Sequence, residues 1–81
     1  MQLKDTVDDM LSDDYRDRFK AEYDQVSIRR DKLGDILDAY YKGELNFQPK
    51  SSISNLESQL ETMDDYLDIL EERAKEEVVD L

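Results

Sequence analysis

The C-terminal part of the chain carries an apolar residue at every third or fourth position, and this pattern limits the fold more than any other feature. The repeat consists of Ile53, Leu60, Leu67, Ala74 and Leu81, seven positions apart, with Leu56, Met63 and Leu70 interleaved. Such a repeat over about four heptads is typical of a helix that buries a narrow apolar stripe against another helix. The sequence therefore predicts a long helix over residues 52–78 that packs on a helical partner.

A second apolar stripe predicts that partner. It consists of Tyr15, Phe19, Tyr23, Val26, Leu33, Leu37 and Tyr40, which are separated by helical steps. Ser12 and the acids after it are typical of a helix start, and Gly43 is typical of a helix end, so this helix is predicted over residues 13–42. Arg30 occupies a position where the stripe expects an apolar residue, and it either extends to solvent or places a charge in a pocket. Gly34 indicates either a close approach of two helices or a tolerated defect.

These elements predict an all-α fold in a single domain, residues 1–81. The loop over residues 43–51 is short, so the two long helices are expected to form an antiparallel helical hairpin. A short N-terminal helix over residues 3–11 is expected to pack on the hairpin or on a neighbouring protomer. Two helices alone leave the apolar stripes partly exposed to solvent, so self-association into an oligomeric bundle is expected to complete the core. The predicted seam consists of Phe19, Val26, Leu33, Leu37, Leu56, Leu60, Met63, Leu67 and Leu70.

The composition argues against catalysis. The chain has no Cys and no His, so it lacks a thiol nucleophile, an imidazole base and the usual transition-metal ligands. Acid pairs such as Asp64-Asp65 are adjacent in sequence, and adjacent helical residues point about 100° apart instead of converging. We therefore expect no enzyme, no metal and no cofactor.

The net charge limits the partners. A formal charge of −11 disfavours direct binding to nucleic acid and to anionic membranes, because both need cationic contacts. No apolar run reaches the length of about 20 residues that spans a membrane, and the N-terminus lacks the pattern of a signal peptide. The expected location is the cytoplasm.

The bases are concentrated in one segment. Residues 15–33 hold six bases against four acids, although the chain as a whole is acidic. Polar side chains with affinity for anionic, aromatic ligands flank the seam in both helices, since Arg pairs with phosphate, Tyr stacks on bases and Gln reads polar edges. The candidate ligand-binding residues are Arg18, Tyr23, Gln25, Arg29, Gln59, Tyr66 and Arg73. The alternative interpretation is an ordinary protein interface, because these residue types are common there.

The second long helix is dense in acids and offers another function. Its acidic surface could imitate the phosphates of nucleic acid and occupy a basic groove on another protein. The alternative is a solvated helix exterior.

The sequence also resembles a family of short phage proteins known from crAss-like and related tailed phages. The resemblance lies in the run Ser12-Asp13-Asp14-Tyr15-x-x-Arg18-Phe19-x-Ala21-Glu22-Tyr23-x-Gln25, in Gly43-x-Leu45-x-Phe47-x-Pro49, and in Gln59-Leu60, Tyr66-Leu67 and Arg73-Ala74. Arg30 departs from the pattern, where relatives carry an aromatic residue, and the C-terminus is only loosely similar.

The hairpin architecture of this family is similar to that of phage counter-defence sponges, which sequester cyclic-nucleotide immune signals. The resemblance thus implies a homo-oligomer in the host cytoplasm that traps a cyclic or ADP-ribose-type nucleotide. The alternatives are an acidic, anti-CRISPR-like inhibitor that binds a basic host defence protein, and a small structural phage protein.

Overall fold

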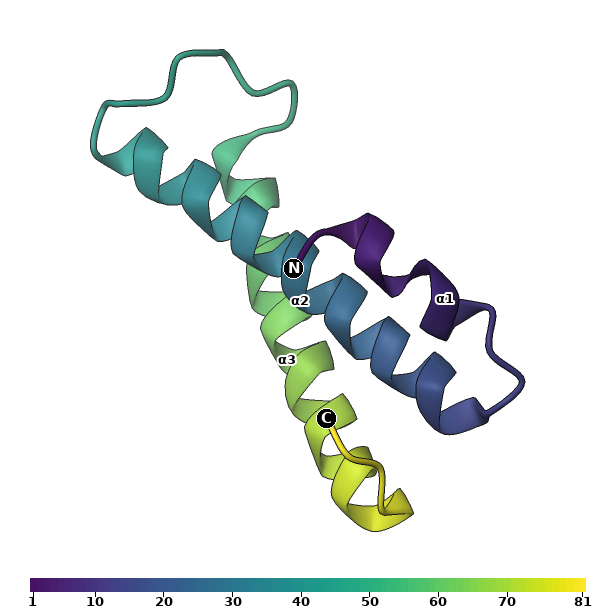
Figure 1. The fold of residues 1–81 in the computed structure, drawn as a ribbon. Coiled ribbons are helices and arrows are strands. Elements are labelled where there is room, and N and C mark those ends of the chain that lie inside the picture. The colour runs from purple at the N-terminus through teal and green to yellow at the C-terminus, as the bar shows by residue number, and fades with distance from the viewer.

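The structure, a computed structural model, describes residues 1–81 and is helical throughout, which confirms the all-α prediction (Figure 1). A 3-10 turn η1 (Leu3–Thr6) leads into the short helix α1 (Val7–Met10), followed by α2 (Tyr15–Tyr41) and α3 (Ile53–Glu77). The two long helices form the expected antiparallel hairpin. None of the helices is both long and apolar enough to cross a membrane.

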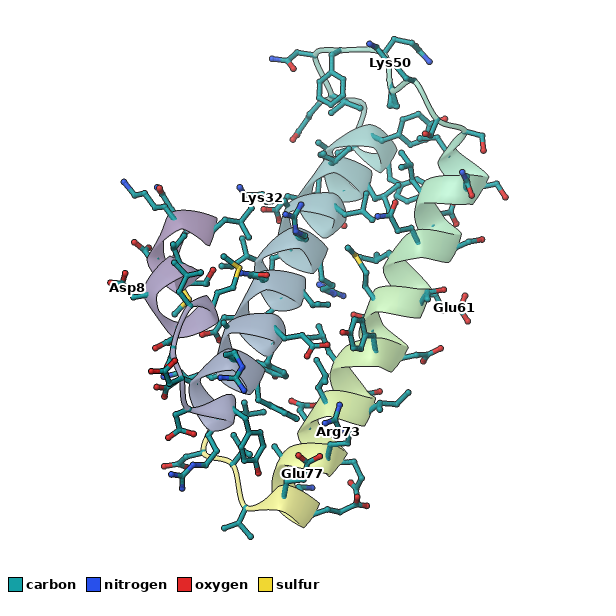
Figure 2. The ribbon with its side chains drawn as sticks, turned by 90° about the vertical axis from the view of Figure 1, so that its right-hand side faces the viewer. Asp8, Lys32, Lys50, Glu61, Arg73 and Glu77 are labelled. Atoms are coloured by element: carbon teal, nitrogen blue, oxygen red, sulfur yellow. The ribbon has the colours of Figure 1, made fainter.

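The helices lie side by side in one layer, with α2 in the middle (Figure 2). The N-terminal arm, which we define as η1 and α1, contacts α2 on the side opposite α3 and does not contact α3. The molecule measures 43 × 24 × 17 Å. Since a helix with its side chains is about 10–12 Å across, both broad sides of this layer remain open to solvent.

Helix α2 begins at Tyr15, two residues later than the sequence predicts, because Asp14 and not Ser12 is its N-cap. The Asp14 carboxylate accepts a hydrogen bond of 2.9 Å from the backbone N–H of Arg16. Ser12 instead donates its hydroxyl to Asp17 at 2.7 Å and accepts from the backbone N–H of Asp14 at 3.1 Å. The serine therefore folds the segment before the helix, and the aspartate satisfies a free N–H of the first turn.

Helix α2 ends in a Schellman motif. Gly43 has φ +71°, its N–H donates to the carbonyl of Tyr40 at 3.0 Å, and the N–H of Glu44 donates to the carbonyl of Ala39 at 2.8 Å. A left-handed residue in this position is why the chain has a glycine there. Across the loop, Ser52 caps α3 by accepting from the N–H of Asn55 at 3.1 Å.

The C-terminus departs from the predicted helix over residues 52–78. Helix α3 ends at Glu77, because Val78 adopts the left-handed conformation with φ 56° and ψ 50° and turns the chain back. This turn buries Val79, so Leu81, which the heptad pattern placed on the helix, follows the helix instead and is half exposed. We call residues 78–81 the C-terminal hook.

The seam of the hairpin is only partly covered. Phe19, Leu37 and Leu70 are buried, and Leu70 has no exposed surface. The remaining six predicted seam residues, Val26, Leu33, Leu56, Leu60, Met63 and Leu67, are half-buried. The main core cluster lies at the hook, where Phe19, Leu70, Ala74 and Val79 pack together. Self-association, which would cover the rest, stays a prediction.

The N-terminal arm docks on its own α2. Thr6 is almost fully buried, and the side-chain amide of Gln25 donates to its hydroxyl at 2.9 Å and to the sulfur of Met10 at 3.4 Å. Ala21, four positions before Gln25 and therefore on the same side of α2, is also buried. The arm begins with a 3-10 turn, and its helical part ends at Met10, one residue before the predicted limit of the 3–11 helix.

Candidate functional site

The seam between α2 and α3 has two flanks with different chemistry. Successive helical residues are about 100° apart, so side chains three, four or seven positions apart share a flank. On one flank, Tyr23 contacts Glu71 and Arg30 contacts Asp64. On the other, Tyr66 contacts Glu22, and Arg73 lies over the ring of Phe19. These two flanks are the two broad sides of the helical layer.

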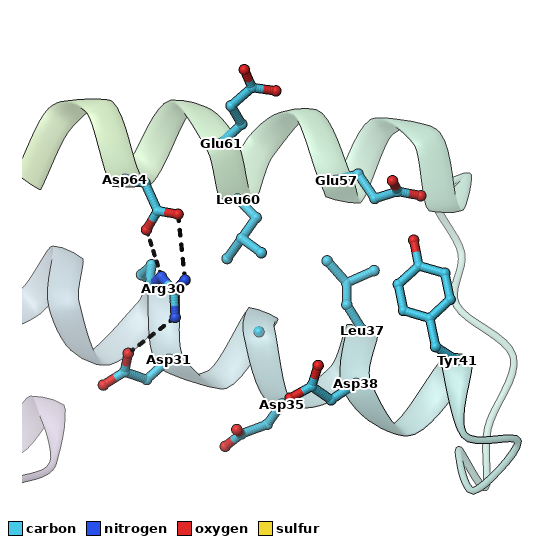
Figure 3. A pocket seen from close by; sticks show the side chains of 11 residues that line it. Arg30, Asp31, Asp35, Leu37, Asp38, Tyr41, Glu57, Leu60, Glu61 and Asp64 are labelled. Carbon is cyan, nitrogen blue, oxygen red and sulfur yellow. Dashed lines mark hydrogen bonds and ion pairs between the residues drawn. The ribbon is translucent and has the colours of Figure 1, made fainter.

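The first flank contains a cleft of about 710 Å³ near the loop end of the hairpin, which we call the acidic cleft (Figure 3). Its apolar residues, Leu37, Leu60 and Tyr41, come from both helices, and Gly34 lies between them. Six carboxylates line it against a single guanidinium. They belong to Asp31, Asp35, Asp38, Glu57, Glu61 and Asp64, and the guanidinium belongs to Arg30.

Arg30 crosses the seam in this cleft and binds Asp64. Its Nε donates to Oδ1 of Asp64 at 2.6 Å and its Nη2 donates to Oδ2 at 3.3 Å, while Nη1 lies 3.6 Å from Asp31 (Figure 3). The hydrogen bond from Arg30 holds the pKa of Asp64 below its ordinary value. Arg30 therefore interrupts the apolar stripe in order to pair an acid across the hairpin, which settles the two interpretations left open by the sequence.

Tyr41 closes one end of the acidic cleft. Its hydroxyl faces the carboxylate of Glu57 (Figure 3), and hydrogen bonding to that carboxylate raises the pKa of Tyr41. Tyr23, further along the same flank, donates its hydroxyl to Glu71 at 2.9 Å, and this bond likewise raises the pKa of Tyr23. A flank so rich in carboxylates repels anions and attracts cations.

The opposite flank carries most of the predicted ligand-binding residues, and we call it the Tyr66 face. It comprises the polar side chains of Arg18, Glu22, Gln25 and Arg29 from α2 and of Gln59, Tyr66 and Arg73 from α3. The steps of four, three and four along α2 and of seven along α3 place each set on one side of its helix. The contact of Tyr66 with Glu22 joins the two sets across the seam.

Arg73 is fixed near the C-terminal end of α3 (Figure 2). Its guanidinium carbon lies 4.9 Å from the centre of the Phe19 ring, an arrangement that stabilises the cation on the aromatic face. Its Nε donates to Glu77 at 2.8 Å, one turn along the helix, and this bond raises the pKa of Arg73. The position of Arg73 is thus set in advance of any ligand.

Arg29 and Gln59 are the two members of the Tyr66 face that have no partner. Both side chains are exposed, and neither makes a hydrogen bond or an ion pair in the protomer. By contrast, Gln25 binds the N-terminal arm, and Arg18 donates to the backbone carbonyl of Ser12 at 2.7 Å. Arg29 and Gln59, on either side of the seam, are therefore the members of this face whose whole side chains are free to bind another molecule.

The seven predicted residues are thus not brought together into one cavity of the protomer. Six of them lie on the Tyr66 face, two of these six hold the N-terminal segment in place, and Tyr23 lies on the opposite flank. Their ligand-binding role stays a prediction. The acidic cleft was not predicted as a site, although Arg30 within the stripe and acids seven positions apart at Glu57 and Asp64 are the signals that could have indicated it.

No group of three or more acidic side chains lies close enough together to hold a metal ion.

The fold and the two flanks define a class: a small helical-hairpin protein whose partly open seam is bordered by polar and charged side chains. Within that class the chain belongs to the Sequestin family, whose sequence profile matches residues 13–76, and so covers both long helices. No curated protein and no solved structure matches the chain significantly.

Proposed function

We propose that the protein is a binding protein, not an enzyme, that sequesters an anionic nucleotide on the Tyr66 face. The setting is phage counter-defence, and the ligand is a cyclic or ADP-ribose-type immune signal. One observation carries the proposal: Arg29 and Gln59 present unpaired donors on the same face as Tyr66 and Arg73. Membership in the Sequestin family and the resemblance to phage sponge proteins support it.

Each residue has a role that fits such a ligand. Arg29 binds phosphate oxygens bidentately, and Gln59 contacts a polar edge of the base. The ring of Tyr66, which is 39% exposed, stacks on the base. Arg73 uses only its Nε to bind Glu77, so its remaining N–H groups donate to the phosphate. An anionic ligand bound to the Tyr66 face lies on the flank opposite the acidic cleft and is therefore not repelled by its carboxylates at close range.

Native mass spectrometry of the protein with a panel of cyclic and ADP-ribose-type nucleotides tests the proposal. Stoichiometric uptake of one nucleotide is expected, and Arg29→Gln should reduce its affinity by about 10-fold or more, as for loss of a charged hydrogen bond. Lys50→Gln is the matched control, because it removes the same charge from an exposed loop position. No uptake from the panel, or equal loss in both variants, contradicts the proposal.

The acidic cleft favours a second candidate, the inhibitor of a basic host protein. Its six carboxylates and single guanidinium form a local negative surface that suits a basic partner. The dependence of binding on ionic strength distinguishes the two candidate functions, since binding through exposed charges weakens steeply as the salt concentration rises. Glu61→Gln, at the exposed edge of the cleft, should weaken such a partner and leave nucleotide binding unchanged.

A further inference from the structure

We infer that the N-terminal arm is an autoinhibitory latch on the Tyr66 face. In the docked position the arm withholds donors of this face from an anionic ligand, and its release makes them available. This role deepens the proposed function, on which it rests for the identity of the ligand. The whole Tyr66 face lies within residues 13–76, the part of the chain that matches the family, and the arm lies outside it.

The arm engages the amide of Gln25, which lies four positions before Arg29 in the same row of α2. The amide nitrogen donates to the Thr6 hydroxyl at 2.9 Å and to the Met10 sulfur at 3.4 Å. Residues four positions apart on a helix are neighbours, so a phosphate bound to Arg29 lies within reach of this amide once the arm has left. The docked arm therefore withholds a donor next to the free guanidinium.

The segment that connects the arm to α2 engages a second donor. Arg18, seven positions before Gln25, donates to the backbone carbonyl of Ser12 at 2.7 Å. The backbone N–H of Ser12 in turn donates to the carbonyl of Asp9, the third residue of α1, at 3.2 Å. These two bonds couple Arg18 to the arm, so release of the arm also weakens the contact that holds Arg18.

The arm also brings negative charge to the face. Residues 1–14 hold five aspartates and one lysine, whereas residues 15–33 of the neighbouring α2 hold six bases and four acids. An acidic segment docked on a base-rich helix takes the place of an anionic ligand and repels such a ligand at close range. Docking of the arm and binding of an anion are therefore competitive, since both use the same positive stretch of α2.

The arm is weakly attached. Helix α1 has four residues, which is too few for a helix to persist in water without docking. Thr6 is the one buried residue of the arm, while Val7 and Met10 are 40% and 44% exposed, so little apolar surface holds it. The arm contacts α2 and not α3, so it can open without any change in the hairpin.

Thr6→Val tests the latch, because it removes the hydroxyl that accepts from Gln25 and leaves the net charge unchanged. The half-buried amide then lacks its oxygen acceptor while the arm is docked, so docking is weakened. The affinity for each panel nucleotide that binds should rise by about 5-fold, the factor that corresponds to one neutral hydrogen bond. Inorganic pyrophosphate, which carries phosphate oxygens and no base, should show the same rise in isothermal titration calorimetry.

Ser52→Ala is the matched control. It also removes a hydroxyl that accepts one hydrogen bond, at the N-cap of α3, and it destabilises the fold without touching the arm or the Tyr66 face. Both affinities should be unchanged in this variant, which separates release of the arm from a general loss of stability. Circular dichroism should show the two long helices intact in both variants.

Hydrogen exchange of the wild-type chain gives a second test that needs no substitution. Ligands normally slow exchange where they bind, but pyrophosphate or a bound nucleotide that displaces the arm should accelerate exchange in residues 3–10 by several-fold. Exchange in α3 should slow or stay the same, because the hairpin does not open. Slower exchange in residues 3–10 would make the arm a lid that closes over the ligand, and overturns the inference.

The outcomes separate the latch from the proposed function. Nucleotide uptake with equal affinity in Thr6→Val and the wild type overturns the latch and leaves the nucleotide site standing. A rise in pyrophosphate affinity without uptake of any panel nucleotide upholds the latch and refutes the nucleotide. Absence of binding of both probes to both proteins overturns the two proposals together.

Discussion

Arg30 and Asp64 are joined by two hydrogen bonds across the seam, of 2.6 and 3.3 Å, at a point where the apolar pattern of α2 would place a leucine or a valine. The pair links the middle of α2 to the middle of α3 and fixes their register. It also leaves the remaining carboxylates of the acidic cleft without a base of their own, apart from the longer contact of Arg30 with Asp31. Most of the charge of the cleft is therefore uncompensated.

We predict that Arg30→Gln raises the pKa of Asp64 toward its ordinary value of 3.8, because the hydrogen bond from Arg30 is what lowers it. A carboxyl with a lowered folded pKa adds stability above its unfolded pKa and loses that stability as the pH falls through the folded value. The variant should therefore lose stability at neutral pH and show less dependence on pH in the acid range. NMR titration of the Asp64 carboxyl carbon measures the shift.

Arg16→Gln is the control for this titration. Arg16 binds Asp14 through its side chain and backbone and lowers the pKa of that carboxyl in the same way. Its replacement should raise the pKa of Asp14 and leave that of Asp64 where it is. If Asp64 titrates alike in the wild type and in Arg30→Gln, the cross-seam pair does not form in solution.

Val78 offers a stabilising substitution. It is a β-branched residue in the left-handed region, where L-residues other than glycine are strained by about 1–2 kcal/mol, and its side chain is 83% exposed. Val78→Gly should raise the free energy of unfolding by about 0.5–1 kcal/mol, after allowance for the greater freedom of glycine in the unfolded chain. Urea denaturation followed by circular dichroism measures it.

The neighbouring position provides the opposite result. Val79→Ala removes a side chain that is only 9% exposed and packs on Phe19 and Leu70, so it should cost about 1–2 kcal/mol. Should Val78→Gly destabilise the protein as much as Val79→Ala, the hook is not held in the conformation described.

The two glycines should respond oppositely to alanine. A methyl group on Gly34 would meet Nη1 of Arg30 at 3.4 Å and a methyl of Leu60 at 4.0 Å, which are tolerable contacts with flexible groups. Gly34→Ala should therefore stabilise the protein by about 0.5–1 kcal/mol through helix propensity. Gly43→Ala should destabilise it by about 1–2 kcal/mol, because its φ of +71° disfavours any side chain. Thermal unfolding of both variants measures the difference, and a loss of stability in Gly34→Ala would show that the helices need the glycine for close approach.

Gln25 should hold the N-terminal arm in place on α2. Replacing it with leucine removes the hydrogen bond to the buried Thr6 hydroxyl, at a cost of about 1 kcal/mol to arm docking. Hydrogen exchange should then be faster in residues 3–10 and unchanged in α3, which the arm does not touch. Glu22→Gln, which alters the contact with Tyr66 of α3 and does not touch the arm, is the control and should leave the exchange of residues 3–10 unchanged. Faster exchange of α3 in Gln25→Leu would mean that the arm and the hairpin open together.

Periodicity predicted the helices well because both long helices bury a stripe. The stripe through Phe19 and Leu37 predicted one long helix, and the stripe through Leu56 and Leu70 predicted the other. The short segment between the stripes predicted the loop and the antiparallel order. The exact ends of the helices depend on single residues, which the periodicity does not identify. Ser12 and Asp14 are both good caps, and the pattern cannot rank them. No sequence pattern predicts that a valine, Val78, adopts a left-handed conformation.

The candidate site was harder to predict than the fold. Residues that flank a seam can belong to either side of it, and Tyr23 lies only about 100° from Glu22 on the helix, enough to place it on the opposite flank. Likewise, spacing identifies Gln25 as a polar residue beside the seam but cannot show that the arm has already engaged its amide.

The central place of α2 also sets an order for folding. Docking of the arm joins residues 15 and 19 positions apart in the sequence. The contacts of α2 with α3 begin with Tyr41 and Glu57, 16 apart at the loop, and extend to Tyr23 and Glu71, 48 apart near the hook. Closing a shorter loop costs less chain entropy and takes less time. The arm and the loop end of the hairpin can therefore pair first, on opposite sides of α2, and the rest of α3 then closes along the seam toward the hook.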